Sequence, residues 1–205
     1  MEENENENEN EDQKDYLEGK LILLGDSYVG KTNLINVATG KNFDDGYNLT
    51  IGGNFLSKTF EIDSVKYKIN LWDTAGSERY RGLTKLFYKG SDIVIFVYDI
   101  TSEKSFSSLE DWIKETKDII ENDYVCGIVG NKKDLYKEEK ITEQEGENFA
   151  KKKGMKFKLV SAKEDKISFI DFIEELTKDA KINLEKKRAA ILLQNKKNKK
   201  HKCKC

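Results

Sequence analysis

The sequence predicts an α/β fold, an open and mostly parallel sheet of six strands with one antiparallel strand and with helices on both faces. From residue 20 onward, short apolar segments alternate with segments of helical periodicity, which is the pattern of such sheets. Only Asp63 and Ser64 separate the second and third apolar segments, so these strands are expected to form an antiparallel hairpin. A glycine-rich loop also joins the first strand to a helix.

The elements can be placed in order along the chain. Strands are expected at residues 21–24, 54–62, 66–72, 93–98, 125–129 and 156–160, and a first helix at residues 33–37. Thr142 and Glu145 form a capping-box pattern that opens a helix ending near residue 153. Two more helices are indicated by apolar faces, one with Phe106, Leu109, Ile113 and Ile120 and the other with Phe169, Phe172, Ile173 and Leu176.

The charges divide the chain of 205 residues into three parts. The net charge is −2, but residues 2–18 hold nine acids and one lysine, and residues 186–205 hold nine Lys or Arg and no acid. We expect a disordered acidic tail at residues 1–18, a folded domain at residues 19–182 and a basic tail at residues 183–205. No apolar segment reaches the roughly 18 residues of a membrane span, and none resembles a secretory signal. With three cysteines, these features favour a cytoplasmic chain without a disulfide framework.

The glycine-rich loop fits the pattern G-x-x-x-x-G-K-[ST] from Gly25 to Thr32. Its glycines allow successive backbone N–H groups to converge on an anion, and the helix N-terminus adds its positive end. Lys31 supplies a point charge, and the Thr32 hydroxyl is a ligand for Mg²⁺. A turn without a ligand is the alternative for the motif taken alone. The residues expected to hold phosphate are Asp26, Ser27, Tyr28, Val29, Gly30, Lys31 and Thr32.

Ligands of open α/β sheets bind beyond the carboxyl ends of the strands, and informative residues follow three of the predicted strands. A carboxylate at Asp73 can hold Mg²⁺ through water, although a helix cap explains this residue alone equally well. A glycine at Gly76 lets a backbone N–H approach the terminal phosphate. Asp134 can accept hydrogen bonds from the N1–H and N2–H₂ groups of guanine, which adenine does not offer. Asn131 and Lys132 follow the fifth predicted strand together with Asp134, and Ser161, Ala162 and Lys163 follow the sixth.

These motifs, in this order, resemble those of the small GTPases of the Ras superfamily and, within it, of Rab proteins, over residues 20–180. The Rab-like stretches are TIG at residues 50–52, WDTAG at 72–76, ERY at 78–80 and FYKG at 87–90. The resemblance implies a P-loop NTPase fold and a molecular switch in vesicle trafficking, which binds GTP or GDP with Mg²⁺ and hydrolyses GTP.

The resemblance also implies roles for single residues. The residues implied to hold guanine are Asn131, Lys132, Asp134, Ser161, Ala162 and Lys163. Phe43 stands where the family stacks an aromatic ring on the base, and Tyr47 stands where a tyrosine covers the phosphates. The implied metal ligands are Thr32, Thr50 and Asp73, and the implied catalytic positions are Lys31, Thr50, Gly76 and Ser77.

The C-terminal residues Cys203 and Cys205 resemble the doubly geranylgeranylated Cys-x-Cys ending of Rab proteins. Two lipid chains and the neighbouring basic stretch would hold the protein on the cytosolic face of an intracellular membrane. An exchange factor, an activating protein, GDI-type escort proteins and effectors are the further implied partners. The basic stretch alone also fits a nucleic-acid or nuclear-import patch, but the adjacent cysteines favour the membrane, so no nucleic acid is expected.

Ser77 occupies the position where the family has the glutamine that orients the attacking water. A serine hydroxyl is too short to replace that amide, so weak intrinsic hydrolysis is expected. Two functions of different classes follow. The chain is either a switch that hydrolyses GTP with the help of an activating protein, or a hydrolysis-deficient, constitutively GTP-loaded membrane module that recruits effectors.

Overall fold

The computed structural model describes residues 16–46, 50, 53–74 and 85–202, and at residues 53, 54, 85 and 195–202 it describes the backbone alone. One sheet of six strands, in the order β2-β3-β1-β4-β5-β6, forms its centre. The strands are β1 (Leu17–Leu24), β2 (Gly53–Ile62), β3 (Val65–Thr74), β4 (Ile93–Asp99), β5 (Val125–Asn131) and β6 (Lys156–Leu159). Only β2 pairs antiparallel, with β3, and the other pairs are parallel. The predicted fold class is confirmed.

The predicted hairpin between β2 and β3 is confirmed as well. Asp63 and Ser64 both have positive φ, 51° and 60°, which matches the backbone of a two-residue type I′ turn. This turn fixes the register of the whole ladder, from Ile62 opposite Val65 to Gly53 opposite Thr74. The strand that carries Asp73 is thereby aligned with the strand that begins at Gly53.

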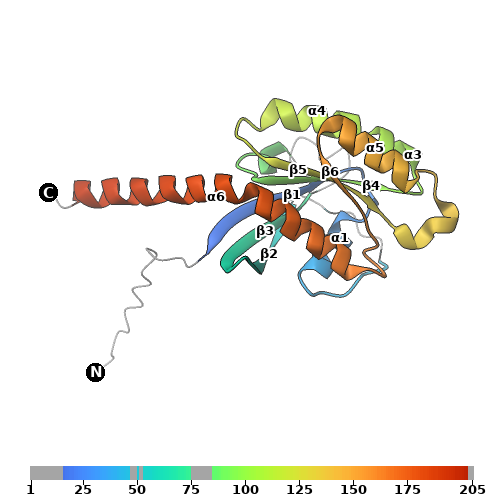
Figure 1. Cartoon of the computed structure of the whole chain (residues 1–205), viewed down its shortest axis with the longest axis horizontal. Coiled ribbons are helices and arrows are strands. Elements are labelled where there is room, and N and C mark those ends of the chain that lie inside the picture. Colours follow the sequence, from blue (N-terminus) through green and yellow to red (C-terminus); the bar gives the residue numbers. More distant parts are fainter. Residues whose placement is uncertain (1–15, 47–49, 51–52, 75–84, 203–205) are drawn as a thin grey trace, which may run out of the picture.

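The helices lie in two layers, with α1 and α6 on one face of the sheet and α3, α4 and α5 on the other (Figure 1). Each layer buries its own hydrophobic cluster against the sheet. All seven residues of β4 are buried, as expected for a central strand that is covered on both faces. The helices are α1 (Lys31–Ala38), α3 (Glu103–Ser107), α4 (Leu109–Ile119), α5 (Glu143–Lys153) and α6 (Lys166–Lys202), and short 3₁₀ turns are η3 (Lys85–Phe87) and η4 (Lys133–Glu138).

One helix prediction was wrong in its continuity. The apolar face from Phe106 to Ile120 was expected on one helix, but the chain breaks at Ser108, which ends α3 and begins α4. The hydroxyl groups of Ser107 and Ser108 both donate to the carbonyl oxygen of Lys104. Such side-chain bonds compete with the helical ladder, while the apolar side chains still pack into one cluster.

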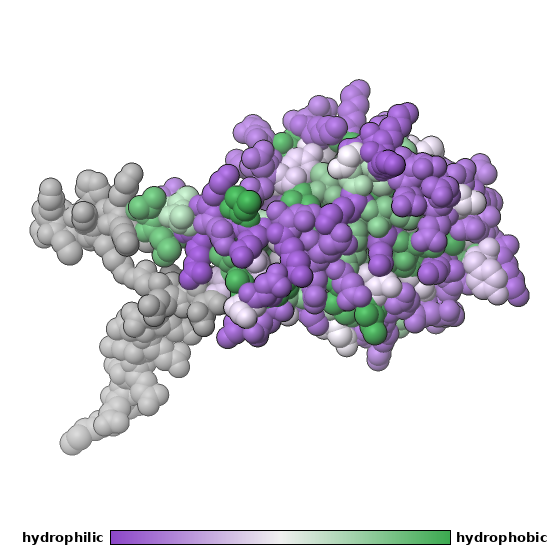
Figure 2. Space-filling model, in the orientation of Figure 1, coloured by the Kyte–Doolittle hydropathy of each residue, from purple (hydrophilic) through white to green (hydrophobic). Residues whose placement is uncertain are grey.

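Helix α6 continues past the predicted domain boundary at residue 182. Leu184 is fully buried against the core, and the ammonium of Lys187 donates to the carboxylate of Asp92 over 2.8 Å. Beyond that ion pair the helix projects from the sheet, and Figure 2 shows apolar surface on the projecting part. Ile191, Leu192 and Leu193 are exposed there. Among the described residues, no helix combines the length and apolar composition needed to cross a bilayer.

Candidate functional site

A cavity of about 310 Å³ lies where β1, β3, β5 and β6 end. Because the carboxyl ends of the parallel strands meet at one edge, the loops that follow them form its walls. The predicted site residues that line it are Ser27, Tyr28, Gly30, Lys31, Thr32, Phe43, Thr50, Asn131, Lys132, Asp134, Ala162 and Lys163. The structure therefore brings together, in one cavity, residues separated by more than 100 positions in the sequence.

The loop between β1 and α1 forms one end of the cavity. Lys31 is buried at the first position of α1, and its ammonium donates to the carbonyl oxygens of Gly25 and Asp26, each over 2.8 Å. Burial lowers the pKa of Lys31 to about 8, and the nearby carboxylates of Asp73 and Asp26 oppose that shift. The side chain remains a cation at neutral pH, so it can contribute a positive charge inside the cavity.

Glycine is required at the end of this loop. Gly30 has a φ of 95° and precedes α1 directly. A Cβ atom at Gly30 would lie 2.4 Å from Nδ2 of Asn131. Any side chain here would push apart the loop and the β5 end, which meet at this point.

Next to this loop, three oxygen-bearing side chains converge. The hydroxyl of Thr32 donates to Oδ2 of Asp73 over 2.8 Å, and it lies 3.0 Å from the hydroxyl of Thr50. Thr50 also donates to Oδ2 of Asp73, at 3.4 Å. Oδ1 of Asp73 is buried without a hydrogen-bond partner among the described residues. Burial raises the pKa of Asp73, against the hydrogen bond from Thr32 and the charge of Lys31. Hard oxygen ligands with one acceptor left over fit Mg²⁺.

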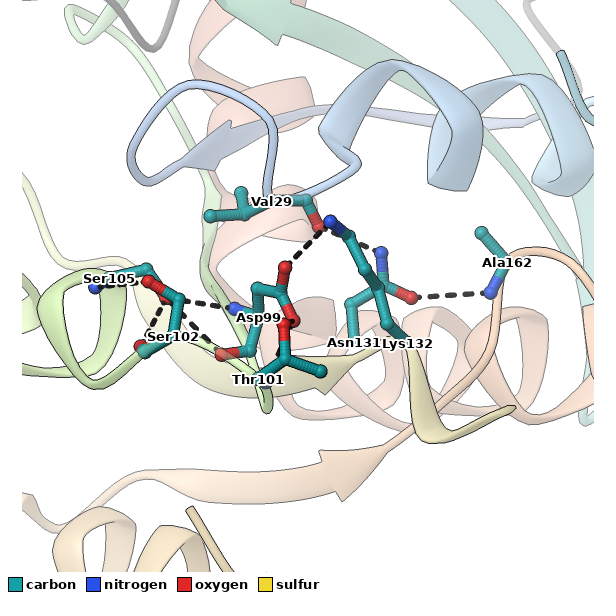
Figure 3. A network of polar contacts seen from close by, with 8 residues as sticks. All are labelled: Val29, Asp99, Thr101, Ser102, Ser105, Asn131, Lys132 and Ala162. Atoms are coloured by element: carbon teal, nitrogen blue, oxygen red, sulfur yellow. Dashed lines mark hydrogen bonds and ion pairs between the residues drawn. The ribbon is translucent and has the colours of Figure 1, made fainter. Parts of the chain in front are cut away.

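The part of the cavity formed by the residues that follow β5 and β6 is held together by Asn131 at the end of β5 (Figure 3). Its amide Nδ2 donates to the carbonyl oxygen of Val29 over 2.8 Å, and its Oδ1 accepts from the N–H of Ala162 over 3.2 Å. One buried side chain thus joins the loop after β1 to the loop after β6. The hydroxyl of Ser161 in turn donates to Oδ1 of Asp134 over 2.5 Å, which orients that carboxylate.

Comparisons of the sequence with a family model and with known proteins agree on the family of this chain. The model of the Ras family matches residues 20–198. The human Ras-related protein Rab-30 is 38% identical over 167 residues, 80% of this chain and 82% of Rab-30. Rab-8A of Pongo abelii is 38% identical over 84% of this chain and 83% of its own length. Rab-11B of Dictyostelium discoideum is 41% identical over 72% of this chain and 67% of its own length.

The chain belongs to the Rab small GTPases of the Ras superfamily. Members of this family are GTP-binding switches that bind GTP or GDP with Mg²⁺ and hydrolyse GTP. The cavity is therefore the candidate nucleotide site of this Rab protein.

Several predicted site residues of this Rab protein do not line the cavity, but most of them form hydrogen bonds with residues that do. Val29 contributes the carbonyl oxygen that Asn131 binds, and Ser161 orients Asp134. The carboxylate of Asp26 accepts from the indole N–H of Trp112 on α4 over 2.9 Å. The carboxylate of Asp73 accepts a hydrogen bond from the hydroxyl of Thr32. The predictions for Tyr47, Gly76, Ser77, Cys203 and Cys205 lie outside the described residues.

Asp99 was missed by the reasoning from sequence. Its Oδ2 lies 2.6 Å from the ammonium of Lys132, and its Oδ1 accepts from the N–H and hydroxyl of Thr101 (Figure 3). Lys132 itself adopts a φ of 69°, so this ion pair holds a backbone conformation that is uncommon outside glycine. The position of Asp99 at the end of the buried strand β4 was the available signal. The residues that line the cavity and were missed are Asn33, Asn36, Asp44, Asp45, Gly46, Thr74 and Leu135.

Away from the cavity, this Rab protein carries a cluster of aromatic side chains on β2, β3 and η3. The rings of Phe55 and Trp72 stack with centroids 5.1 Å apart, and Phe87 lies 5.3 Å from Trp72. The ammonium of Lys20 lies 4.7 Å from the Trp72 ring, where it can form a cation–π contact. Phe55 is 52% exposed and the neighbouring Leu86 is 73% exposed. Exposed apolar side chains gathered in this way are typical of protein interaction surfaces.

Proposed function

We propose that this Rab protein selects guanine through Asp134 and acts as a membrane-attached switch whose own hydrolysis of GTP is slow. The orientation of Asp134 carries the first part of the proposal. Ser161 occupies one carboxylate oxygen, and among the described residues nothing binds the other, although the side chain lines the cavity. A guanine base supplies two N–H donors for such an acceptor, whereas adenine supplies none in the matching positions.

The phosphates of the nucleotide belong at the other end of the cavity. Lys31 and the backbone N–H groups of the Gly25–Gly30 turn supply the positive groups there, and Thr32, Thr50 and Asp73 would hold Mg²⁺. The bound ion would neutralise developing negative charge on the phosphate oxygens. The unpaired Oδ1 of Asp73 supports this assignment, since a buried carboxylate oxygen without a partner is costly.

Slow hydrolysis is proposed from Ser77, where the family has a glutamine. An activating protein that inserts its own polar side chains would complete the site, and the chain would then be a switch. Without such a protein, the chain would remain GTP-loaded and mark its membrane permanently. Single-turnover hydrolysis with and without an activating protein separates these two functions.

Competition binding of GTP, GDP, ATP and XTP to the full chain tests the guanine assignment. We expect at least a hundred-fold preference for GTP over ATP. Asp134→Asn should lose at least a hundred-fold in GTP affinity and gain affinity for XTP, whose 2-oxo group suits an amide donor. Asp171→Asn, the same chemical change on an exposed part of α6, is the matched control. Equal affinity of the wild type for ATP and GTP would overturn the assignment.

Membrane attachment is proposed through lipid groups on Cys203 and Cys205 together with the basic end of α6. The exposed Ile191, Leu192 and Leu193 support contact with a lipid surface. Replacing both terminal cysteines by serine should move the protein from the membrane fraction to the soluble fraction of its own cells, at unchanged nucleotide affinity. Cys126→Ser, which alters the half-buried cysteine of β5, should leave the distribution unchanged. Mass spectrometry that finds neither terminal cysteine lipidated would contradict the proposal.

Effectors and regulators are proposed to bind the aromatic cluster of Phe55, Trp72 and Phe87, since it offers exposed apolar side chains on β2, β3 and η3. The strand begins with Gly53 and Asn54, where Rab proteins usually have valine and an acid. This difference argues for effectors of a different chemistry from those of the relatives.

A further inference from the structure

One wall of the cavity is a loop that has little secondary structure to support it. Residues 41–46 belong to neither helix nor strand, and Phe43, Asp44, Asp45 and Gly46 all line the cavity. Phe43 is half-buried and packs against the hydrophobic cluster beneath α1 and α6. A displacement of this loop would therefore open the cavity along four consecutive residues.

The side chain of Asn33 holds this loop to α1. Its Nδ2 donates to the carbonyl oxygen of Asp44 over 2.8 Å, and its Oδ1 accepts from the N–H of Asp44 over 2.9 Å. Asn33 thus acts on Asp44 as a neighbouring strand would, since it satisfies both the donor and the acceptor of one backbone residue. The carboxylate of Asp44 accepts from the N–H of Gly46, which continues the turn.

These two hydrogen bonds are a large part of what holds the loop. Among the described residues, they are the only hydrogen bonds that join residues 42–46 to the rest of the chain. The preceding residue, Lys41, is bound through its N–H to the carbonyl oxygen of Asn36. The position of Phe43 then depends on its own partial burial and on the side chain of Asn33.

We propose that Asn33 is a positioning residue that retains the nucleotide, because it holds Phe43 and Asp44 in place as a wall of the cavity. The inference rests on the proposed function, in which the cavity binds a guanine nucleotide. A nucleotide leaves faster when the wall is easily displaced. Both hydrogen bonds are exposed to solvent, so each is expected at the low end of the usual range, and losing the two together corresponds to about five- to ten-fold in rate.

The test is the dissociation rate of radiolabelled GDP from the full chain, chased with unlabelled GDP. Asn33→Ala should dissociate GDP about five- to ten-fold faster than the wild type, with an association rate changed less than two-fold. Asn122→Ala is the matched control, since its amide also binds backbone carbonyl oxygens of a loop, those of Ser91 and Asp123, away from the cavity. This control should change the GDP dissociation rate less than two-fold while lowering the thermal unfolding midpoint similarly.

A double-mutant cycle with Phe43→Ala separates positioning from a general loss of stability. If Asn33 acts by holding Phe43, the double variant should release GDP hardly faster than Phe43→Ala alone. Dissociation from Asn33→Ala within two-fold of the wild type, an equal effect of Asn122→Ala, or fully multiplicative effects in the cycle would each overturn the inference. A wild type that binds no guanine nucleotide would instead overturn the proposed function.

Discussion

At the end of the cavity that holds Asn131 and Asp134, polar side chains bind one another, whereas at the end that holds Lys31 and Asp73 a buried polar atom has no partner among the described residues. The amide N–H and the amide oxygen of Asn131 both bind backbone groups, those of Val29 in one loop and Ala162 in another. Asp73, in contrast, leaves Oδ1 buried and unbound. The first end is assembled by the protein itself, and the second leaves an acceptor for the Mg²⁺ that we propose.

With two such ends, one cavity can combine selectivity for a base with switching. A base pocket that keeps its geometry at all times can reject the wrong base, because its acceptors do not rearrange to suit another partner. A phosphate end whose buried carboxylate needs a cation is stabilised only when phosphate and metal are bound. Changes at the base end should therefore affect stability and affinity together, while changes at the phosphate end should affect metal dependence and rate.

The largest effect is expected from Asn131→Ala. This change leaves the carbonyl oxygen of Val29 and the N–H of Ala162 buried and unpaired, and each unsatisfied group costs about 1–3 kcal/mol. We expect the free energy of unfolding to fall by about 3 kcal/mol and the GTP affinity to fall at least a hundred-fold. Denaturant unfolding and equilibrium binding measure the two effects, with the exposed Asn148→Ala as control. Loss of affinity at unchanged stability would contradict the idea that the protein assembles this end by itself.

A smaller effect, about ten-fold, is expected from removal of Mg²⁺ at the other end. EDTA should accelerate GDP dissociation from the wild type, since Thr32, Thr50 and Asp73 would lose the ion that they share. In Asp73→Asn the effect of EDTA should shrink below two-fold. The stability of this variant without nucleotide should equal or exceed that of the wild type, because an amide is less costly to bury than a carboxylate. If EDTA leaves the GDP dissociation rate of the wild type unchanged, this end of the cavity does not hold the metal.

Local sequence patterns predicted the parts of the molecule that are encoded by neighbouring residues. The glycine-rich loop between β1 and α1, the two-residue hairpin at Asp63 and the capping box at Thr142 were placed correctly, and the box forms with both of its hydrogen bonds. Side-chain contacts between residues far apart in the sequence could not be predicted from these local patterns. The hydrogen bonds of the Asn33 side chain with the backbone of Asp44, and the ion pair of Lys132 with Asp99, join residues of different structural elements.

Boundaries were also set by distant partners. Strand β1 begins at Leu17 instead of residue 21, because residues 17–20 pair with residues 67–70 of β3 although half of them are polar. Helix α6 gains support beyond residue 182 from Leu184 in the core and from the ion pair of Lys187 with Asp92. The hydrophobic periodicity of these two segments does not reveal the pairing with β3 or the contacts of Leu184 and Lys187.

The smallest and most specific effect is expected at Ser77, which is proposed to influence the chemical step alone. A glutamine amide can orient the attacking water, and a serine hydroxyl at the same position is too short to reach it. Because that interaction exists mainly in the transition state, its absence slows the chemical step without weakening binding. We expect Ser77→Gln to raise single-turnover intrinsic hydrolysis several-fold, equivalent to about 1 kcal/mol of barrier, at nearly constant GTP affinity. Ser77→Ala is the control and should hydrolyse GTP as slowly as the wild type. If the glutamine and serine proteins hydrolyse GTP equally fast, another group positions the water, and the proposed weak intrinsic activity loses its basis.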